Sequence, residues 1–228
     1  MQNDLIGYHA GRPFNLIPEQ SALLILDMQR YFLDPASHAF VPSAVTIVPR
    51  MMVLIETYRN LKLPVIFTKH LNTPGNAGSM NTWWKNIIRR EDPMSDLIPE
   101  IAELNPTTLE KEQYDAFFGT DLEGWLHENN VTQVVIGGVM THLCCETTAR
   151  SAFVRGFDVF FLIDGTATYH IDFHRSSLLT LSHGFAIPCR IEQVTNRLES
   201  ANKKAVIKED GKIHVDSSAL HRIRGEKG

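Results

Sequence analysis

The fold of this chain is decided by the stretch Gly137-Gly138-Val139-Met140-Thr141-His142-Leu143-Cys144-Cys145. The apolar run at 131–136 is typical of a buried parallel strand, because strands covered on both faces read as continuous Val and Ile. Two glycines follow it, and residues 141–157 then show a helical pattern that Gly156 closes. Cys144 is therefore expected in the first turn of a helix, at the carboxyl end of a strand. The unpaired N–H groups and the dipole of such a turn lower the pKa of a thiol and can hold an oxyanion.

The composition is that of an ordinary globular domain. The chain has 228 residues, of which 43% are hydrophobic and 21% are charged, and this length allows a sizeable core. A formal net charge of −4 and a pI of about 6.2 argue against nucleic-acid binding through bulk charge. No apolar run reaches transmembrane length, and no signal peptide is evident at the N-terminus. Three cysteines, two of them adjacent, predict no disulfide framework and favour a cytoplasmic location.

Six predicted strands alternate with predicted helices along the chain. The strands are expected at 21–26, 65–68, 107–111, 131–136, 157–163 and 185–188, and helices at 49–61, 120–129, 141–157, 175–183 and 195–204. This alternation predicts an α/β fold, a three-layer α/β/α sandwich around a six-stranded, mostly parallel sheet. With the Rossmann-like order 3-2-1-4-5-6, the switch point lies between the first and fourth strands. Asp27, Lys111 and Cys144 would then open onto one crevice.

Three segments are expected to flank this core within a single domain at 1–228. Residues 1–20 resemble an extended N-terminal arm, and the irregular insert at 71–106 is long enough to be a lid or a binding loop. Asp210-Gly211 lies between two apolar triplets and predicts a small hairpin. Together with the polar end of the chain, residues 205–228 are predicted to form a C-terminal hairpin and tail.

Cys144 is the leading candidate for chemistry, because a thiolate in an electropositive turn is a nucleophile. The alternative is that it is a small buried apolar residue, which is a common role for a free cysteine. Its place above the crevice favours the nucleophile. Cys145 lies about 100° further around the helix and should face the core. Cys189, near the sixth strand, is expected to pack there.

Asp27 and Lys111 are the charged residues that can serve this cysteine. Asp27 ends the first strand, where a carboxylate is costly to bury unless it is paired, so it is the expected base or proton shuttle. The alternative is that it caps a turn. Lys111 ends the third strand and would keep Asp27 ionised or face the substrate, whereas a lone lysine is usually solvated. Their joint position is what makes either of them a candidate.

A substrate pocket is predicted from aromatic and polar residues near the crevice. The aromatic members are either pocket residues or ordinary core residues, and the two histidines are more often structural than metal ligands. No paired His/Asp spacing, P-loop or GxGxxG motif is present, so neither a metal nor a cofactor is predicted. The candidate pocket residues are Phe32, His70, Trp83, Trp84, Tyr114, Phe117, Thr141 and His142.

Three motifs resemble the isochorismatase-like cysteine hydrolase family, which includes isochorismatases, nicotinamidases and N-carbamoylsarcosine amidohydrolases. They are LILDMQ at 24–29, EKEQYDAF at 110–117 and GVMTHLCCETTA at 138–149. Their order and spacing match over most of the chain, and together the three are specific. The resemblance implies a catalytic triad of Asp27, Lys111 and Cys144. It also implies a non-proline cis peptide at Val139–Met140 and an oxyanion hole formed by the backbone N–H groups of Met140 and Cys144.

Two branches of that family differ from this chain. Nicotinamidases carry a metal site with an Asp two residues before a His after the second strand, and this pair is Thr68 and His70 here, so the metal site is incomplete. Isochorismate-cleaving members typically lack a cysteine at the position of Cys144. The sequence therefore favours an amidohydrolase that cleaves a C–N bond of a small amide or carbamoyl compound through a thioester.

Two alternatives remain open at the level of the sequence. One is vinyl-ether hydrolysis of isochorismate, which releases pyruvate and leaves Cys144 as a bystander. The other is a non-catalytic binding scaffold that retains the sheet but not the reaction. In each enzymatic case the partner is a small-molecule substrate, and neither nucleic acid nor membrane is expected. Because family members usually assemble, a homo-oligomer, a dimer or a tetramer, is also expected.

Overall fold

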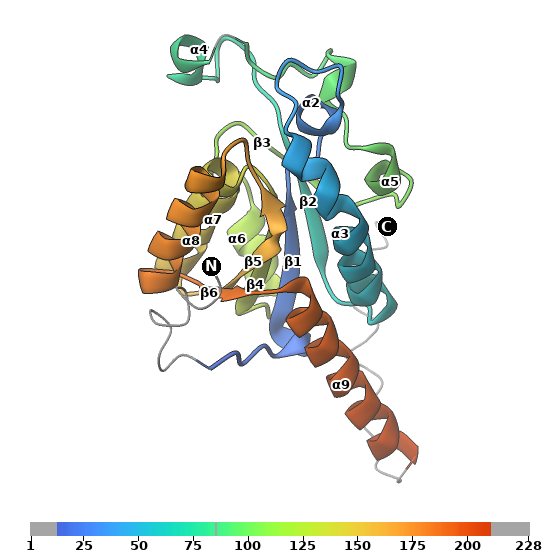
Figure 1. Ribbon diagram of the computed structural model, residues 1–228. Coiled ribbons are helices and arrows are strands. Elements are labelled where there is room, and N and C mark those ends of the chain that lie inside the picture. Colours follow the sequence, from blue (N-terminus) through green and yellow to red (C-terminus); the bar gives the residue numbers. More distant parts are fainter. Residues whose placement is uncertain (1–12, 85, 211–228) are drawn as a thin grey trace, which may run out of the picture.

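Six parallel strands form one sheet at the centre of the molecule (Figure 1). The computed structural model describes residues 13–84 and 86–210. The strand order is β3-β2-β1-β4-β5-β6, and each neighbouring pair is parallel. This confirms the predicted sheet and its order, with the switch point between β1 and β4. The strands are β1 (Ser21–Leu26), β2 (Val65–His70), β3 (Thr108–Lys111), β4 (Gln133–Val139), β5 (Asp158–Ala167) and β6 (Ile187–Cys189).

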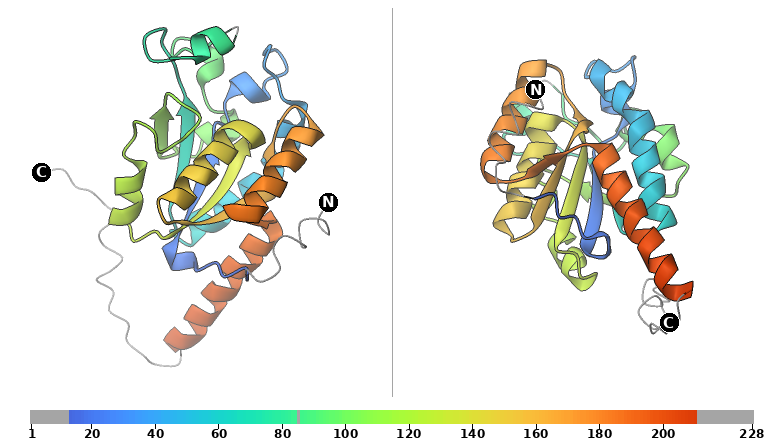
Figure 2. Two further views of the ribbon diagram at one scale, coloured as in Figure 1. Left: turned by 90° about the vertical axis from the view of Figure 1, so that its left-hand side faces the viewer. Right: turned by 60° about the horizontal axis from the view of Figure 1, so that its bottom comes forward.

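Helices cover both faces of the sheet and complete three layers (Figures 1 and 2). The helices α3 (Pro42–Asn60) and α9 (Ile191–Asp210) pack together on one face, and α6 (Leu122–Glu128), α7 (Glu146–Val154) and α8 (Ile171–Gly184) lie on the other. Strand β1 shows how the sequence serves both layers. Leu23 and Ile25 join the apolar cluster under α3 and α9, and Leu24 and Leu26 join the opposite cluster. All four are fully buried, which explains the continuous apolar run.

Strand β4 runs past its predicted end at residue 136 because two glycines let it continue beside β1. Gly137 pairs with Ile25 and Gly138 with Leu26. Gly138 has a φ of +114°, and a Cβ atom there would lie 2.1 Å from the carbonyl oxygen of Leu26. Only glycine fits this approach. The glycine pair therefore holds the turn that follows against the end of β1.

Several helices differ from the sequence-based bounds. Helix α3 begins at Pro42, seven residues earlier than predicted, with that proline in its first turn and Pro49 inside it. Helix α8 begins at Ile171, where the His170 side chain accepts a hydrogen bond from the N–H of Asp172 and caps the helix. In both cases the apolar spacing that guided the prediction covered only part of the helix.

The predicted C-terminal hairpin is wrong in its first arm. Residues 205–207 continue helix α9, which runs to Asp210. The surrounding Glu, Ala and Lys residues are strong helix formers, and a two-stranded hairpin is marginal by itself. The second arm and the tail lie outside the described residues, as do residues 1–12 of the N-terminal arm.

The insert at 71–106 lies over the carboxyl ends of β1 and β2 (Figure 1). It contains two single-turn helices, α4 (Met80–Trp83) and α5 (Pro99–Ala102), and the 3-10 turn η2 (Pro93–Ser95). Another single turn, α2 (Arg30–Leu33), follows β1 and contacts η2. Among the described residues, we find no helix with both the length and the apolar character needed to cross a bilayer.

Candidate active site

Asp27 is held at the end of β1 by the hydroxyl of Thr68 from the neighbouring strand β2. The Asp27 side chain is fully buried, and its backbone has a φ of +51°. The Thr68 hydroxyl donates a hydrogen bond of 2.5 Å to Oδ1 of Asp27 and accepts one of 3.1 Å from the Asp27 N–H. Oδ1 of Asp27 is therefore hydrogen-bonded to Thr68, and Oδ2 faces Lys111.

Lys111 meets Asp27 in a completely buried ion pair. Its Nζ lies 2.8 Å from Oδ2 of Asp27, and both side chains have no exposed surface. The ammonium also donates hydrogen bonds to Nδ1 of His70 at 3.2 Å, to the carbonyl oxygen of Gln113 at 2.9 Å and to Sγ of Cys144 at 3.3 Å. These three acceptors use the three N–H bonds of the ammonium. Oδ2 of Asp27 is thus paired by charge, yet it accepts no well-aligned hydrogen bond among the described residues.

Cys144 lies in a π-helical turn, η3 (Thr141–Cys145), rather than in the first turn of a regular α-helix as predicted. The carbonyl oxygen of Met140 accepts hydrogen bonds from the N–H groups of Leu143 and Cys145, on either side of Cys144. The peptide bond that joins Val139 to Met140 is cis. Helix α7 begins only after this turn. Cys145 faces the apolar cluster on the opposite side, and Cys189 is buried beside α9, so both are packing residues as predicted.

The charges of this cluster favour a neutral thiol beside a carboxylate and an ammonium. Burial alone would raise the pKa of Asp27, but the charge of Lys111, with His70 and Cys144, brings that pKa below its ordinary value. Burial lowers the pKa of Lys111, and Asp27 and Cys144 more than offset this. Burial and the charge of Asp27 raise the pKa of Cys144, although Lys111 opposes them. The lowered thiol pKa predicted from the helix dipole is therefore wrong for the resting protein.

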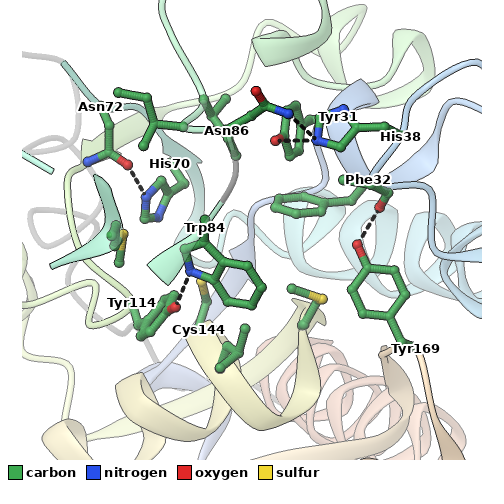
Figure 3. A pocket seen from close by; sticks show the side chains of 16 residues that line it. Tyr31, Phe32, His38, His70, Asn72, Trp84, Asn86, Tyr114, Cys144 and Tyr169 are labelled. Carbon is green, nitrogen blue, oxygen red and sulfur yellow. Dashed lines mark hydrogen bonds between the residues drawn. The ribbon is translucent and has the colours of Figure 1, made fainter. Parts of the chain in front are cut away.

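A cavity of about 250 Å³ opens above Cys144 between the insert and the carboxyl ends of the strands. Figure 3 shows Tyr114, Trp84 and Cys144 together on one side, with Phe32 and Tyr169 across from them. The indole N–H of Trp84 donates a 2.6 Å hydrogen bond to the Tyr114 hydroxyl. The lining is mostly aromatic and apolar. It consists of Tyr31, Phe32, His38, Ala39, His70, Asn72, Met80, Trp84, Asn86, Ile87, Ile88, Tyr114, Met140, Leu143, Cys144 and Tyr169.

Four of the eight predicted pocket residues line this cavity, namely Phe32, His70, Trp84 and Tyr114. The other four lie elsewhere. Trp83 is 78% exposed on the outer side of α4, and Phe117 stacks on Phe157 in the core under α6 and α7. Thr141 is buried and hydrogen-bonds the ring of His174, and His142 bonds Thr168 and stacks on Phe173. Both residues belong to the turn η3, and their contacts link that turn to helix α8 and to the loop after β5.

Several residues that the structure brings to the site are not among the pocket or catalytic residues predicted from the sequence. Thr68 hydrogen-bonds Asp27, and Asn72 hydrogen-bonds His70. A threonine is common in strands, so its residue type does not mark Thr68 as part of a site. Tyr169 comes from the loop after β5, and its hydroxyl donates to the carbonyl oxygen of Ala39. Asn86 comes from the irregular insert, where no periodic pattern assigns a facing direction. Apart from the bond between Asn72 and His70, these contacts join segments far apart in the chain.

A thiol, a carboxylate and an ammonium at the switch point of a parallel sheet define a candidate cysteine-hydrolase site. Comparison with known proteins agrees with that class. The model of the isochorismatase domain family matches residues 21–193, so the chain belongs to the isochorismatase family of hydrolases.

The similar proteins carry different functional names. Nicotinamidase 3 of Arabidopsis thaliana is 37% identical over 171 residues, which cover 73% of this chain and 82% of that protein. Enterobactin synthase component B of Escherichia coli K12 is 29% identical over 164 residues, which cover 71% of this chain and 57% of that protein. Among solved structures, a cysteine hydrolase from Pseudomonas syringae pv. phaseolicola 1448A has a TM-score of 0.79 at 27% identity. That alignment covers 84% of this chain and 99% of the other.

Proposed function

We propose that this protein is a cysteine amidohydrolase that cleaves a C–N bond of a small, uncharged amide or carbamoyl compound through a thioester. The observation that carries the proposal is the position of the Cys144 sulfur. It lines the cavity and lies 3.3 Å from Nζ of Lys111, which in turn lies 2.8 Å from Oδ2 of Asp27. A sulfur in this position can attack the carbonyl carbon of a bound substrate, with Asp27 as the base and Lys111 as the nearby cation.

The first half of the reaction forms the acyl-enzyme. Asp27 takes the proton of Cys144 as the sulfur attacks the carbonyl carbon, because a thiol with a raised pKa ionises only as the new bond forms. The Lys111 N–H that already points at the sulfur stabilises its developing charge. The N–H groups of Met140 and Cys144 receive the oxyanion. Asp27 then gives its proton to the departing nitrogen, the C–N bond breaks, and a thioester remains.

The second half releases the acid. Asp27 accepts a proton from water as the water oxygen attacks the thioester carbonyl. The tetrahedral intermediate collapses, the C–S bond breaks, and Asp27 returns its proton to the sulfur. Lys111 remains charged throughout and keeps Asp27 ionised between steps, since its pKa is raised. The products are a carboxylic or carbamic acid and ammonia or an amine.

The cavity supports an uncharged substrate. Its described lining contains no lysine or arginine, and the one ammonium beneath it is neutralised by Asp27. Burying a carboxylate without a cation to pair it is costly. An aromatic or otherwise flat amide would instead pack against Trp84, Phe32 and Tyr114.

Vinyl-ether hydrolysis is the second candidate, because the domain family that matches this chain is named for isochorismatase. Isochorismate carries two carboxylates, which the described lining does not pair with cations. For this reason we rank that reaction below amide hydrolysis. A non-catalytic scaffold is a third reading. Slow alkylation of Cys144 would not identify a scaffold, since a buried thiol with a raised pKa reacts slowly in an enzyme as well.

The experiment that separates these readings measures ammonia and pyruvate release across a panel of amides, carbamoyl compounds and isochorismate. Cys144→Ala should lower amide turnover by a factor of at least about 10³, because the covalent route is lost. It should leave the fold, judged by circular dichroism, unchanged. Intact-mass detection of an acyl adduct on the wild type would support the thioester. Pyruvate release that survives Cys144→Ser would favour the vinyl-ether reaction, and an absence of turnover on the whole panel would favour the scaffold.

A further inference from the structure

His70 touches the charged cluster, yet the proposed reaction gives it no role. The residue is buried, and its ring lines the cavity. Nζ of Lys111 lies 3.2 Å from Nδ1 of this ring, 2.8 Å from Oδ2 of Asp27 and 3.3 Å from Sγ of Cys144. Because the ammonium fills the space among these three groups, they do not fit a metal ion. The contact between the imidazole and the ammonium therefore needs another explanation.

The Asn72 side chain determines which ring nitrogen of His70 carries a proton. The amide nitrogen of Asn72 donates a 2.8 Å hydrogen bond to the carbonyl oxygen of Glu112, which turns Oδ1 of Asn72 toward the ring. That oxygen only accepts and lies 2.7 Å from Nε2 of His70, so Nε2 carries the proton. Nδ1 is then the nitrogen that accepts from Lys111. Burial and the charge of Lys111 lower the pKa of His70 to about 4, so the ring is neutral at ordinary pH.

The backbone of His70 is held by a second amide side chain. Gln29 is fully buried, and its Oε1 accepts from the His70 N–H at 2.9 Å, while its Nε2 donates to the His70 carbonyl oxygen at 3.2 Å. The same Nε2 donates to the carbonyl oxygen of Ser95 at 2.7 Å, which ties the end of β2 to the insert. Because Asn72 holds the ring and Gln29 the backbone, the direction of Nδ1 is fixed in the resting protein.

Lys111 depends on this acceptor for its own orientation. An ammonium has three N–H bonds, and those of Lys111 go to Nδ1 of His70, the carbonyl oxygen of Gln113 and Sγ of Cys144. With two of them held by His70 and Gln113, the third points at the sulfur. Without the acceptor at His70, a buried N–H of a charged group would have no partner, and the ammonium would turn or shift to find one.

We propose that His70 is a positioning residue, whose neutral imidazole holds the Lys111 ammonium so that one N–H points at the sulfur of Cys144. In this role the imidazole transfers no proton. It acts through Lys111 on the charge that develops on the sulfur, so its loss should lower kcat more than it raises KM. The meaning of that kcat rests on the proposed function, whereas the anchoring of Lys111 belongs to the resting protein and is measurable without a substrate.

Two variants with side chains of similar size isolate the acceptor. Both His70→Asn and His70→Leu lose the ring and its bond to Asn72, but Asn keeps an oxygen that can take the place of Nδ1. We expect kcat of the Leu variant to be at least about 10-fold below that of the Asn variant, with a smaller difference in KM. If His70 only filled space, the two variants, both shown to be folded by circular dichroism, would have equal kcat, and that result would overturn the proposal.

Alkylation of Cys144 measures the same contact without a substrate. Burial and the charge of Asp27 raise the pKa of Cys144, and Lys111 opposes them, so a displaced ammonium should slow the reaction of the thiol with iodoacetamide. At one fixed pH, tandem mass spectrometry should find Cys144 alkylated at least about 10-fold more slowly in His70→Leu than in His70→Asn. Equal rates in the two folded variants would overturn the proposal, whatever the substrate is.

Nitrogen-15 NMR of the wild type tests the tautomer directly. The ring signals of His70 are those that both variants lack, and at neutral pH they should show a neutral ring with its proton on Nε2. A charged ring, or a proton on Nδ1, would overturn the proposal, because Nδ1 could not then accept from Lys111. A protein that passes the alkylation and NMR tests but releases neither ammonia nor an amine from any amide would refute the proposed reaction and leave the anchoring of Lys111 in place.

Discussion

Replacing Thr68 with Val should destabilise the protein at neutral pH by about 3 kcal/mol. Val keeps the shape of Thr and removes only the hydroxyl, which donates to the charged Oδ1 of Asp27 and accepts from the Asp27 N–H. A hydrogen bond to a charged group contributes about 1.5–3 kcal/mol, and a buried N–H left without a partner costs about 1–3 kcal/mol. The two ranges add to about 2.5–6 kcal/mol, but the two effects share one hydroxyl and overlap, so a value near the lower end of the sum is expected.

The size of this effect should depend on pH in a direction that the structure determines. Although burial alone would raise it, the pKa of Asp27 in the folded protein lies below 3.8, chiefly because of Lys111. A depressed folded pKa means that the stability it contributes is present above pH 3.8 and is lost as the pH falls through the folded value. Thr68→Val removes a donor to the charged form and raises that pKa. The destabilisation should thus be largest at neutral pH and shrink below pH 3.8.

Urea denaturation at neutral pH and again below pH 3.8 measures both parts of the prediction. Thr68→Ser is the matched control, because it keeps the hydroxyl and loses only a methyl group. It should cost less than about 1.5 kcal/mol. The acid limb of the kcat/KM profile should move to higher pH in the Val variant alone. Equal urea midpoints for Val and wild type at neutral pH would refute the reasoning, as would an equal loss in Ser and Val.

Three further predictions follow from single contacts. His70 has a pKa of about 4 in the folded protein against an ordinary 6.5, so the unfolded chain binds more protons between these two pH values. The free energy of unfolding should therefore fall by about 3 kcal/mol from neutral pH to pH 4. Urea midpoints of the His70→Gln variant should not show this fall. Gly138→Ala should lower the free energy of unfolding, measured in urea, by more than about 3 kcal/mol, because the added Cβ would clash with the backbone of Leu26. Gly156→Ala is the control. Its φ is +90° and no atom lies within 4 Å of the added Cβ, so it should cost about 1–2 kcal/mol. Trp84→Phe removes the hydrogen bond to the Tyr114 hydroxyl, so in steady-state kinetics it should raise KM about fivefold, with a smaller change in kcat. Trp83→Phe is the control, because Trp83 lies outside the cavity, and it should change neither constant.

The parts of the site that the sequence predicts are those set by the ends of strands. Asp27, Lys111 and Cys144 each follow a strand, and the carboxyl ends of parallel strands meet at one edge of the sheet. Apolar runs locate the strands and alternation gives the topology, so the meeting of the three residues follows from local patterns. The contacts among β1, β3 and η3 bear out that meeting. The roles of these residues in a reaction remain a prediction.

The parts that the sequence does not predict depend on depth and direction. The helix dipole suggested a low pKa for Cys144, but the residue is 95% buried and lies beside a carboxylate, so burial and the charge of Asp27 outweigh Lys111 and raise the pKa of the thiol. Trp83 and Trp84 are adjacent and chemically alike, yet one faces solvent and the other the cavity. Their directions are set by the single turn α4, which has no periodic apolar face to read.

The position of Lys111 makes a neutral thiol compatible with the proposed reaction. Its three N–H bonds go to His70, Gln113 and Cys144, and Nζ lies 2.8 Å from Oδ2 of Asp27, with which the ammonium pairs by charge. The carboxylate is thereby kept ionised, which the proposed reaction requires of its base before the sulfur attacks. A lower thiol pKa would leave Asp27 facing a second anion across a buried site, and the repulsion would raise the energy of the resting state. In the proposed reaction, the proton stays on the sulfur until a carbonyl group is bound, which avoids that repulsion and makes the ionisation of Cys144 depend on the substrate.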